Sequence, residues 1–247
     1  MSEANVCELF SGIQGEGLHV GRRHLFVRFA GCNLSCRYCD TPEARRPAER
    51  ARLERRPGER EFDELPNPLT VDELADRLLA LDAGLPHHAI SLTGGEPLLQ
   101  ADCIAALITR CPGRRFHLET NGTLPDELAK VIDGVHTVAM DIKLRSAAGS
   151  EPEPGVSRRF LGRAARREVF VKVVVSRSTD EGEIMETAAL IAEVGRDIPL
   201  VLQPVTPGFG GVERPDPLQL VRFQTIALDV LDDVRVIPQM HKIIGQK

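Results

Sequence analysis

Three cysteines lie within eight residues of one another in the segment FAGCNLSCRYCDT, where Cys32, Cys36 and Cys39 follow a CxxxCxxC spacing. Three thiolates this close together can hold an iron–sulfur cluster and leave one iron open, bind zinc with a more distant fourth ligand, or form a redox pair. The cluster is favoured because no neighbouring Cys or His supplies the fourth ligand that structural zinc needs. The open iron of such a cluster can bind a substrate.

Glycines and polar side chains recur beside the β-rich segments. The motif IQGEG, from Ile13 to Gly17, is either a glycine turn or a loop that contacts a ligand. The motif GGEP, residues 94–97, offers glycines that let backbone approach a ligand and a carboxylate able to take a cation. Polar groups also end the segments LETNG, MDIK and LVLQP, where they either cap the next element or line a shared pocket. Arg28, inside the apolar segment HLFVRFA, is expected to meet an anion because an unpaired buried arginine is costly.

Composition and charge narrow the class of protein. The chain has 247 residues, a net charge of −5 and a pI near 5.8, which argues against a nucleic-acid surface and favours a small-molecule substrate. We see no apolar run of eighteen residues and no signal-like start in MSEANVCELF, so we expect a cytoplasmic protein with no membrane contact. In a reducing compartment Cys7, Cys103 and Cys111 are expected to be free thiols.

Strand and helix patterns alternate along the chain and predict one α/β domain, residues 1–247. The expected strands lie near 24–30, 88–93, 115–120, 136–141, 168–176, 198–203 and 233–237. The expected helices lie near 70–83, 98–110, 125–133, 179–194 and 216–231, and a Thr70–Glu73 capping box begins the first of them. About seven strands are too few for a closed eight-unit barrel, so we expect an open parallel one with its site at one rim.

A charged segment, residues 43–66, interrupts this pattern after the cysteines. Its seven arginines and seven acidic residues cancel in charge, and it is predicted to form a helical turn near 48–56 followed by a turn at Pro57 and Gly58. Residues 142–158 and 204–215 lack periodicity and are predicted to be mobile loops over the rim.

The cysteine spacing, with Tyr38 just before the last cysteine, resembles the signature of radical S-adenosylmethionine (SAM) enzymes, and GGEP resembles their SAM-binding motif. The resemblance implies a 4Fe-4S cluster whose fourth iron chelates SAM. It also implies a partial, open TIM-like (β/α)6 barrel, with residues 43–66 as an insertion.

A narrower resemblance runs from end to end of the chain. The motifs IQGEG, FVRFAGCNLSCRYCDT, TGGEP, LETNG, DIK and PQMH together resemble the 7-carboxy-7-deazaguanine synthase family, also called QueE, within the radical SAM superfamily. This implies a lyase that converts 6-carboxy-5,6,7,8-tetrahydropterin to 7-carboxy-7-deazaguanine with release of ammonia, in the biosynthesis of queuosine and other 7-deazapurines. SAM is expected to act catalytically, through a 5′-deoxyadenosyl radical that takes hydrogen from the pterin C6 and later returns it.

The resemblance also assigns roles to residues. The cluster would be held by Cys32, Cys36 and Cys39. The SAM contacts would be Tyr38, Cys39, Asp40, Gly94, Gly95, Glu96, Glu119, Asp141, Ile142, Lys143, Gln203, Pro204, Val205 and Thr206. The substrate contacts would be Ile13, Gln14, Gly15, Glu16, Arg28, Thr93 and His241. Thr41 would be a ligand of Mg²⁺, or else would cap a turn before Pro42.

Two other functions stay open at this point: an activase of a glycyl radical enzyme, which shares the CxxxCxxC and GGE motifs, and a zinc-stabilised binding module. The family resemblance further implies a flavodoxin or ferredoxin as electron donor, a pterin as small-molecule substrate, and a homodimer.

Overall fold

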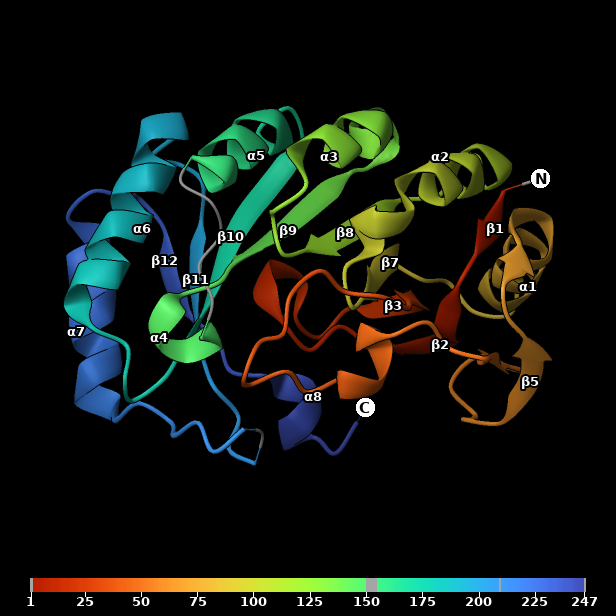
Figure 1. The fold of residues 1–247 in the computed structure, drawn as a ribbon, viewed down its shortest axis with the longest axis horizontal. Helices are drawn as coiled ribbons and strands as arrows, with labels where there is room; N and C mark the ends of the chain where they lie inside the picture. Colours follow the sequence, from red (N-terminus) through yellow and green to blue (C-terminus); the bar gives the residue numbers. More distant parts are fainter. Residues whose placement is uncertain (1, 150–154, 209, 247) are drawn as a thin grey trace.

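A ten-stranded sheet organises the part of the chain that the structure describes, residues 2–149, 155–208 and 210–246 of a computed structural model (Figure 1). The strand order is β12-β11-β10-β9-β8-β7-β3-β2-β4-β5. The strands are β2 Val6–Ile13, β3 Arg23–Phe29, β4 Arg50–Glu54, β5 Phe62–Pro66, β7 Ala89–Gly94, β8 Phe116–Thr120, β9 Thr137–Ile142, β10 Glu168–Val175, β11 Leu200–Pro204 and β12 Val234–Val236. A separate short pair joins β1 Glu3–Ala4 to β6 Leu69–Thr70.

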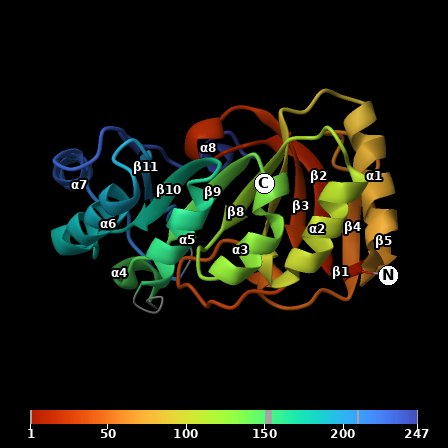
Figure 2. The ribbon, with the colours of Figure 1, turned by 90° about the horizontal axis from the view of Figure 1, so that it is seen from above.

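Within the described residues, the seven strands from β3 to β12 in this order are all parallel. The helices that follow them are α1 Val71–Ala83, α2 Ala101–Arg110, α3 Pro125–Val131, α5 Val156–Ala164, α6 Glu181–Val194 and α7 Pro217–Leu228. These helices form an arc around the outside of the curved sheet, whereas the short helix α8 Met240–Ile243 lies on its other side (Figures 1 and 2). The result is the open parallel barrel that the sequence predicts.

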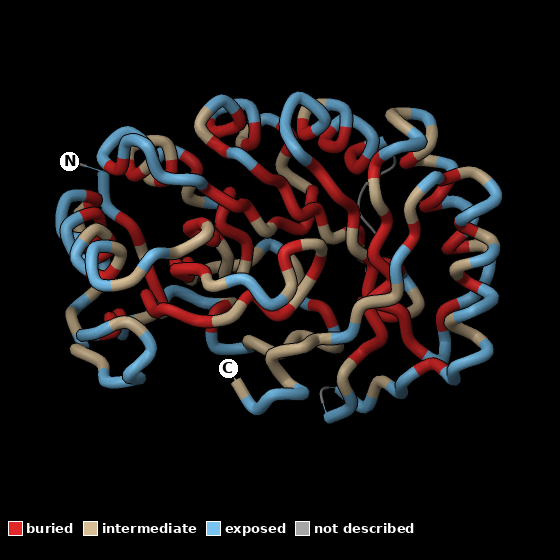
Figure 3. The backbone as a smooth tube through the Cα atoms, turned by 180° about the vertical axis from the view of Figure 1, so that it is seen from behind, coloured by how far each residue is buried: buried red, intermediate tan, exposed pale blue. Residues whose placement is uncertain are grey.

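Side chains alternate across the strands, so one face of the sheet meets the helices and the other faces the interior. On the helix side, Leu118, Met140 and Val171 are buried in the main apolar core, and Figure 3 shows the strands as the most buried part of the molecule. On the interior side, the side chains change along each strand from the amino to the carboxyl end. Strand β3 presents His24, Phe26 and Arg28 in succession, β8 presents His117 and Glu119, and β10 presents Glu168, Phe170 and Lys172.

The predicted strands and the five predicted helices are confirmed, with boundaries that differ by a few residues. Helix α1 begins with the expected capping box: the Thr70 hydroxyl accepts a hydrogen bond from the Glu73 backbone N–H, and the Glu73 carboxylate accepts one from the Thr70 N–H. The first predicted strand corresponds to β3. The strand β2 before it, which pairs antiparallel with β3, was not predicted.

The helical turn predicted near 48–56 is wrong, because residues 50–66 form the β4–β5 hairpin. The sequence RARLE alternates, with Ala51 and Leu53 buried beneath the charged side chains. Cross-strand ion pairs, such as Arg55 to Asp63 at 2.7 Å, then use the opposite charges of the segment. Balanced charge in this segment therefore reflects strand pairing.

The loop predicted at 142–158 is only partly correct. It contains the short helix α4 Arg145–Ala148 and the start of α5, while residues 150–154 lie outside the described residues, as does residue 209 of the second predicted loop. Helix α5 was missed although Val156, Phe160, Leu161 and Ala164 have helical spacing, because the Pro and Gly residues just before it favour a loop.

Replacing Thr70, the N-cap residue of α1, tests whether its hydroxyl stabilises this helix. We expect Thr70→Ala to lower the free energy of unfolding by about 1 kcal/mol, because helix α1 loses the hydrogen bond from the Glu73 N–H to the Thr70 hydroxyl. This corresponds to a decrease in Tm of roughly 2–4 °C for a chain of this size, measurable by differential scanning fluorimetry. Thr70→Ser keeps the hydroxyl and serves as the control. Equal Tm values for the two variants would contradict the capping role.

Candidate active site

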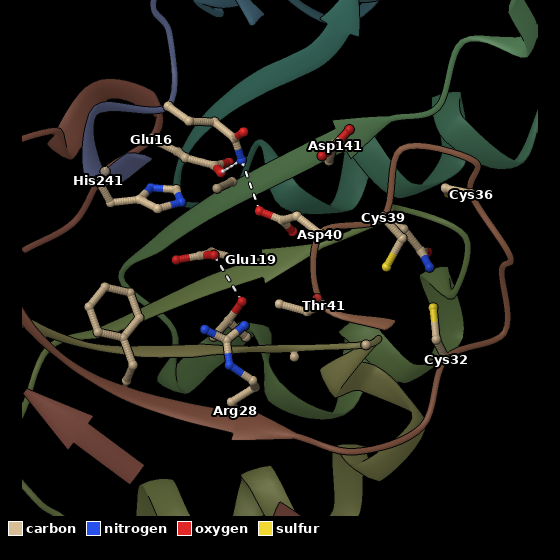
Figure 4. A pocket seen from close by; sticks show the side chains of 18 of the residues that line it. Glu16, Arg28, Cys32, Cys36, Cys39, Asp40, Thr41, Glu119, Asp141 and His241 are labelled. Carbon is tan, nitrogen blue, oxygen red and sulfur yellow. Dashed lines mark hydrogen bonds between the residues drawn. The ribbon is translucent and has the colours of Figure 1, made fainter. Parts of the chain in front are cut away.

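A cavity of about 770 Å³ opens at the carboxyl ends of the parallel strands. Its wall includes the cysteine loop at one end and the IQGEG motif with the C-terminal residues at the other. Figure 4 shows the three cysteines on one side of this space and Glu16 with His241 across from them. Ligand sites in open α/β folds lie at this edge of the sheet.

The cysteine loop, residues 30–41, follows β3 and is tied to the rest of the fold through its backbone. The Gly31 N–H donates to the Ala44 carbonyl at 2.8 Å, and the Cys32 N–H donates to the Arg45 carbonyl at 3.1 Å. Farther along, the Arg37 N–H donates to the Ala148 carbonyl at 3.1 Å. The loop is therefore held at both ends, with its three thiols facing the cavity.

The three thiols are not gathered as closely as a single metal ion requires. Among the described residues, the sets whose ligand atoms all lie within 4.8 Å of one another do not include the three cysteines. Thiolates on one tetrahedral zinc would lie roughly 3.8 Å apart. The cysteines of the described chain are free, and the Leu34 N–H points to the Cys32 sulfur at 3.4 Å, a contact of the kind that tunes iron–sulfur clusters.

Two glycines let the cysteine loop pack directly on the end of β7. Gly94 has a φ of 138°, and a Cβ there would lie 2.1 Å from the Phe29 carbonyl oxygen. A Cβ on Gly95 would lie 2.2 Å from the Gly31 carbonyl oxygen. Only glycine fits both positions, and both residues line the cavity.

Glu96 has a structural position instead. Its fully buried carboxylate accepts hydrogen bonds from the Leu98 and Asn121 N–H groups and from the Thr120 hydroxyl, at 2.8–3.0 Å. Burial raises the pKa of this carboxyl to about 7, although the three donors oppose the change. Glu96 therefore joins the ends of β7 and β8 and does not reach the cavity.

Four charged side chains, each partly buried, form a network in the centre of the site. The Lys172 ammonium contacts both the Glu16 carboxylate and Asp141, the latter at 3.0 Å, and Lys143 contacts Asp141 at 2.9 Å. Burial alone would raise the pKa of Glu16, but Lys172 and the Gln239 amide lower it to about 2. Each of these charges is thus paired with an opposite charge, which offsets the cost of removing it from water.

Glu119 organises a second set of polar groups. Its carboxylate accepts hydrogen bonds from the Gln14 amide at 2.8 Å and from the Thr93 hydroxyl at 2.9 Å. Burial raises the pKa of Glu119, and the nearby Glu16 charge adds to the effect. Gln14 and Thr93 are both expected substrate contacts, so Glu119, which the family resemblance assigns to SAM, is hydrogen-bonded to two residues of the substrate set.

Arg28 meets the anion that the sequence predicts, and the anion is Glu8 on β2. The guanidinium Nε lies 3.6 Å from the Glu8 carboxylate, and the guanidinium carbon Cζ lies 5.8 Å from the centroid of the Phe10 ring. Arg52 of the β4–β5 hairpin binds the same carboxylate at 2.6 Å.

The C-terminal residues close the other end of the cavity. The Met240 N–H donates to the Gly15 carbonyl at 2.8 Å, and a Cβ on Gly15 would lie 2.1 Å from the His241 ring. Gln239 donates to Glu16 at 2.7 Å and to Asp40 at 3.2 Å. The two ends of the chain thereby form one wall.

Most of the expected site residues line this one cavity, and three do not. Those on its wall are Ile13, Gln14, Gly15, Glu16, Arg28, Cys32, Cys36, Tyr38, Cys39, Asp40, Thr41, Thr93, Gly94, Gly95, Glu119, Asp141, Lys143, Gln203, Val205, Thr206 and His241. Glu96, Ile142 and Pro204 are absent from the wall as the structure describes it. Ile142 faces the apolar core, as the alternation of β9 requires.

The sequence analysis missed Lys172, Gln239, Glu8 and His117, which also line the cavity. Lys172 could have been found, since it is the one cation inside the apolar segment VFVKVVV and a lysine buried there needs an anionic partner. Nothing local distinguishes Glu8 or His117.

This fold and cysteine loop define a radical SAM protein. The Radical SAM superfamily pattern matches residues 26–204, and the chain belongs to that superfamily, whose members carry a 4Fe-4S cluster and SAM. The three cysteines of the loop are the residues present that fit such a cluster. Across the described residues, no helix is both long and apolar enough to span a membrane.

Within the superfamily, the chain belongs to the 7-carboxy-7-deazaguanine synthase family. It is 43% identical to the 7-carboxy-7-deazaguanine synthase of Geobacter sulfurreducens, over 98% of each chain. It is 36% identical to that of Methanothermobacter thermautotrophicus, over 99% of this chain and 98% of the relative. The crystal structure of QueE from Escherichia coli has the same fold, with a TM-score of 0.59 at 21% identity, covering 97% of this chain and 95% of the other.

The role of Glu96 gives a testable consequence. We expect Glu96→Gln to lower the free energy of unfolding of the cluster-free chain by about 1–3 kcal/mol, because an amide NH₂ then faces a backbone N–H. The wild-type carboxyl holds its proton in the folded state between its ordinary pKa of 4.5 and about 7. The unfolded chain releases that proton, so the wild-type free energy of unfolding falls as pH rises through this window.

The measurement is urea unfolding at several pH values, with the exposed Glu186→Gln as the control. The fall with pH should be smaller in Glu96→Gln. Unchanged stability of Glu96→Gln together with lost SAM binding would instead assign this carboxylate a direct contact.

Proposed function

We propose that the chain is a radical SAM carbon–nitrogen lyase that converts 6-carboxy-5,6,7,8-tetrahydropterin to 7-carboxy-7-deazaguanine with release of ammonia. One observation carries this proposal: the cysteine loop and a polar pocket of matching residue types share a single cavity. The named relatives in Geobacter and Methanothermobacter support it over nearly the whole chain. We place the activity in 7-deazapurine and queuosine biosynthesis, in a single domain, residues 1–247.

The cavity divides between two ligands by chemistry. When bound, the cluster and SAM supply the radical that starts the reaction at the substrate C6. We assign to SAM the wall beside the cysteines, which includes Tyr38, Gly95, Lys143, Gln203 and Thr206. Asp40, Gly94, Asp141 and Val205 belong to the same part, whereas Ile142, Pro204 and Glu96 would act only by supporting it.

The residues of the other end suit a bicyclic amide-rich substrate. Glu16, whose pKa is lowered to about 2, stays ionised and can accept hydrogen bonds from the pyrimidine N–H donors. Gln14 and Thr93, both held by Glu119, present further polar atoms. Ile13, Gly15 and His241 complete this wall, and Lys172 keeps Glu16 charged and in place.

Arg28 is the proposed partner of the substrate carboxylate. A guanidinium binds a carboxylate through two parallel hydrogen bonds, and this one already lies beside an anion at 3.6 Å, a separation too long for a good hydrogen bond. Glu8 retains Arg52 as a second cation, so Arg28 can turn toward the substrate without leaving Glu8 unpaired.

Turnover under anaerobic conditions tests the function. With SAM, a reductant and the carboxytetrahydropterin, we expect the deazaguanine product to form without stoichiometric consumption of SAM. Cys32→Ala should abolish product because the cluster loses a ligand, whereas Cys111→Ala, buried in the core away from the cavity, should retain activity.

The same preparation separates the rival functions. About four irons per chain and a brown colour support the enzyme, while a colourless chain with zinc on its cysteines would indicate a binding module. Consumption of SAM only in the presence of a protein substrate would favour a glycyl-radical activase.

Thr41 is proposed to bind Mg²⁺ together with oxygens from the substrate. The residue lines the cavity, and within the described part of the chain its side chain makes no capping hydrogen bond to the short helix Pro42–Arg45. This weakens the alternative in which the hydroxyl caps that turn. One hydroxyl is a poor site alone, because Mg²⁺ prefers several oxygens in an octahedron.

Metal dependence should therefore change with this side chain. We expect Thr41→Ala to need at least about tenfold more Mg²⁺ for half-maximal turnover, and Thr41→Ser to resemble the wild type. The measurement is initial rate against Mg²⁺ concentration at saturating substrate. Identical curves for the wild type and Thr41→Ala would exclude the ligand role.

We also propose a homodimer, a flavodoxin or ferredoxin as electron donor, and a cytoplasmic location. For the dimer, helix α7 carries an exposed apolar face made by Leu218, Val221 and Leu228, which are 70%, 59% and 46% exposed. Such a face on a helix at the sheet's edge suits a second copy of the chain.

A further inference from the structure

Four histidines meet inside the barrel at the amino ends of the strands, at the opposite end from the cysteines. His24 begins the inward face of β3, His88 directly precedes β7, His117 lies on β8, and His19 ends the 3-10 helix η1, Gly17–His19. Their ring centroids lie 5.1–6.0 Å apart in the five close pairs. The register explains this: His24 pairs with Ala89, next to His88, and His117 pairs with Ser91.

Three of these rings have a buried nitrogen that finds no hydrogen-bond partner among the described residues. The atoms are His19 Nδ1, His24 Nε2 and His117 Nδ1. All three side chains are more than nine-tenths buried, with residue exposures of 6%, 0% and 2%. A buried polar atom without a partner costs on the order of 1–3 kcal/mol, so three in one place call for a bound group.

The ligand atoms of His19, His24 and His88 all lie within 4.8 Å of one another. Imidazoles bound to one tetrahedral zinc at about 2.0–2.1 Å have their nitrogens about 3.3 Å apart. Binding would require side-chain rotations that bring the nitrogens closer by that difference. His88 is partly exposed and gives the site a route to solvent.

The surroundings fix these rings as they do in known zinc sites. His24 Nδ1 lies 2.8 Å from the Ser91 hydroxyl, which leaves Nε2 for another partner. His19 Nε2 lies 3.4 Å from the Glu168 carboxylate, which leaves Nδ1, and the Thr137 hydroxyl holds Glu168 at 2.8 Å. A carboxylate behind a ligating histidine orients the ring and strengthens its basicity.

The ionisation of the rings agrees with this arrangement. Burial lowers the pKa of His24 to about 3 and also lowers the pKa values of His19, His88 and His117. Neutral imidazoles are the form that binds metal. Arg22 opposes a cation, since its guanidinium Nη1 lies 2.6 Å from Nε2 and 3.1 Å from Nδ1 of His88, but this arginine is exposed and can turn into solvent.

We propose that His19, His24 and His88 form a structural binding site for one zinc ion, with His117 packed beside it. A set of three imidazole ligands with no carboxylate among them suits zinc and not magnesium. Of the four histidines, His117 lines the cavity, with its ring centroid 6.2 Å from that of Phe170, whereas His19, His24 and His88 are not on the cavity wall as the structure describes it. The site is therefore distinct from the cysteine loop and from the Mg²⁺ position at Thr41.

Metal analysis of the untagged, anaerobically prepared holoenzyme tests the proposal. After incubation with zinc and desalting, we expect about one zinc per chain in addition to the cluster iron. His88→Gln should lose that zinc and keep its iron. The matched control is His136→Gln, an exposed histidine that precedes the next strand, β9, at the same end of the sheet.

Two further variants distinguish ligation from packing. His24→Asn keeps a polar group that can bond the Ser91 hydroxyl, as His24 Nδ1 does, but it removes Nε2, the proposed zinc ligand. This variant should therefore lose zinc. Glu168→Gln should weaken zinc binding about 10–100-fold, as the loss of a supporting carboxylate does. The full chain carrying Cys32→Ala, Cys36→Ala and Cys39→Ala should still take up Co²⁺ with the visible absorption of a tetrahedral site, and zinc should displace it.

The result can also overturn the proposal. Zinc content in His88→Gln equal to that of the wild type would exclude the histidine site, as would loss of zinc in the Cys-to-Ala chain. Equal loss in His136→Gln would show nonspecific binding. No zinc in any of these chains, with unchanged Tm on adding zinc, would show that the rings hold only water.

Discussion

The alternation of side chains along the parallel strands is the constraint on which the site depends. Helices cover one face of the sheet with an apolar core, so the chain can place polar groups only on the other face. There the low-dielectric surroundings require every charge to have a partner. Lys172 between Glu16 and Asp141 meets that requirement, and the same pairing keeps Glu16 ionised for a ligand. Fold stability and binding chemistry thus rest on one arrangement of charges.

The site also depends on joining the two ends of the chain. Gly15 has no side chain, which lets His241 pack against the IQGEG backbone, and Gln239 bonds both Glu16 and Asp40. Asp40 directly follows Cys39, the last cysteine of the loop. One amide therefore links the pocket to the cysteine loop, so a ligand at either end of the cavity contacts walls that share this connection.

The sequence was most informative where local signals agree with the fold. The capping box at Thr70, the apolar β-segments and the glycines of GGEP all act through nearby backbone, and the structure places each as expected. It was least informative where a partner comes from afar. The β4–β5 hairpin needs β2 to pair with, and Glu96 bonds Asn121, which follows the next strand. Neither contact leaves a pattern in adjacent residues. The same reason hid Lys172, whose two carboxylates lie on β9 and in the IQGEG loop.

The inward-facing positions along β10 and β8 show how one strand serves several purposes. On β10, Glu168, Phe170 and Lys172 occupy successive inward positions, so the strand supports a histidine, fills the centre and neutralises Glu16. On β8, His117 and Glu119 stand two residues apart, with His117 Nε2 lying 4.0 Å from the Glu119 carboxylate. The four-histidine cluster thereby lies beside Glu119, the residue that holds Gln14 and Thr93. Order at the amino ends of the strands is for this reason a condition for order in the pocket.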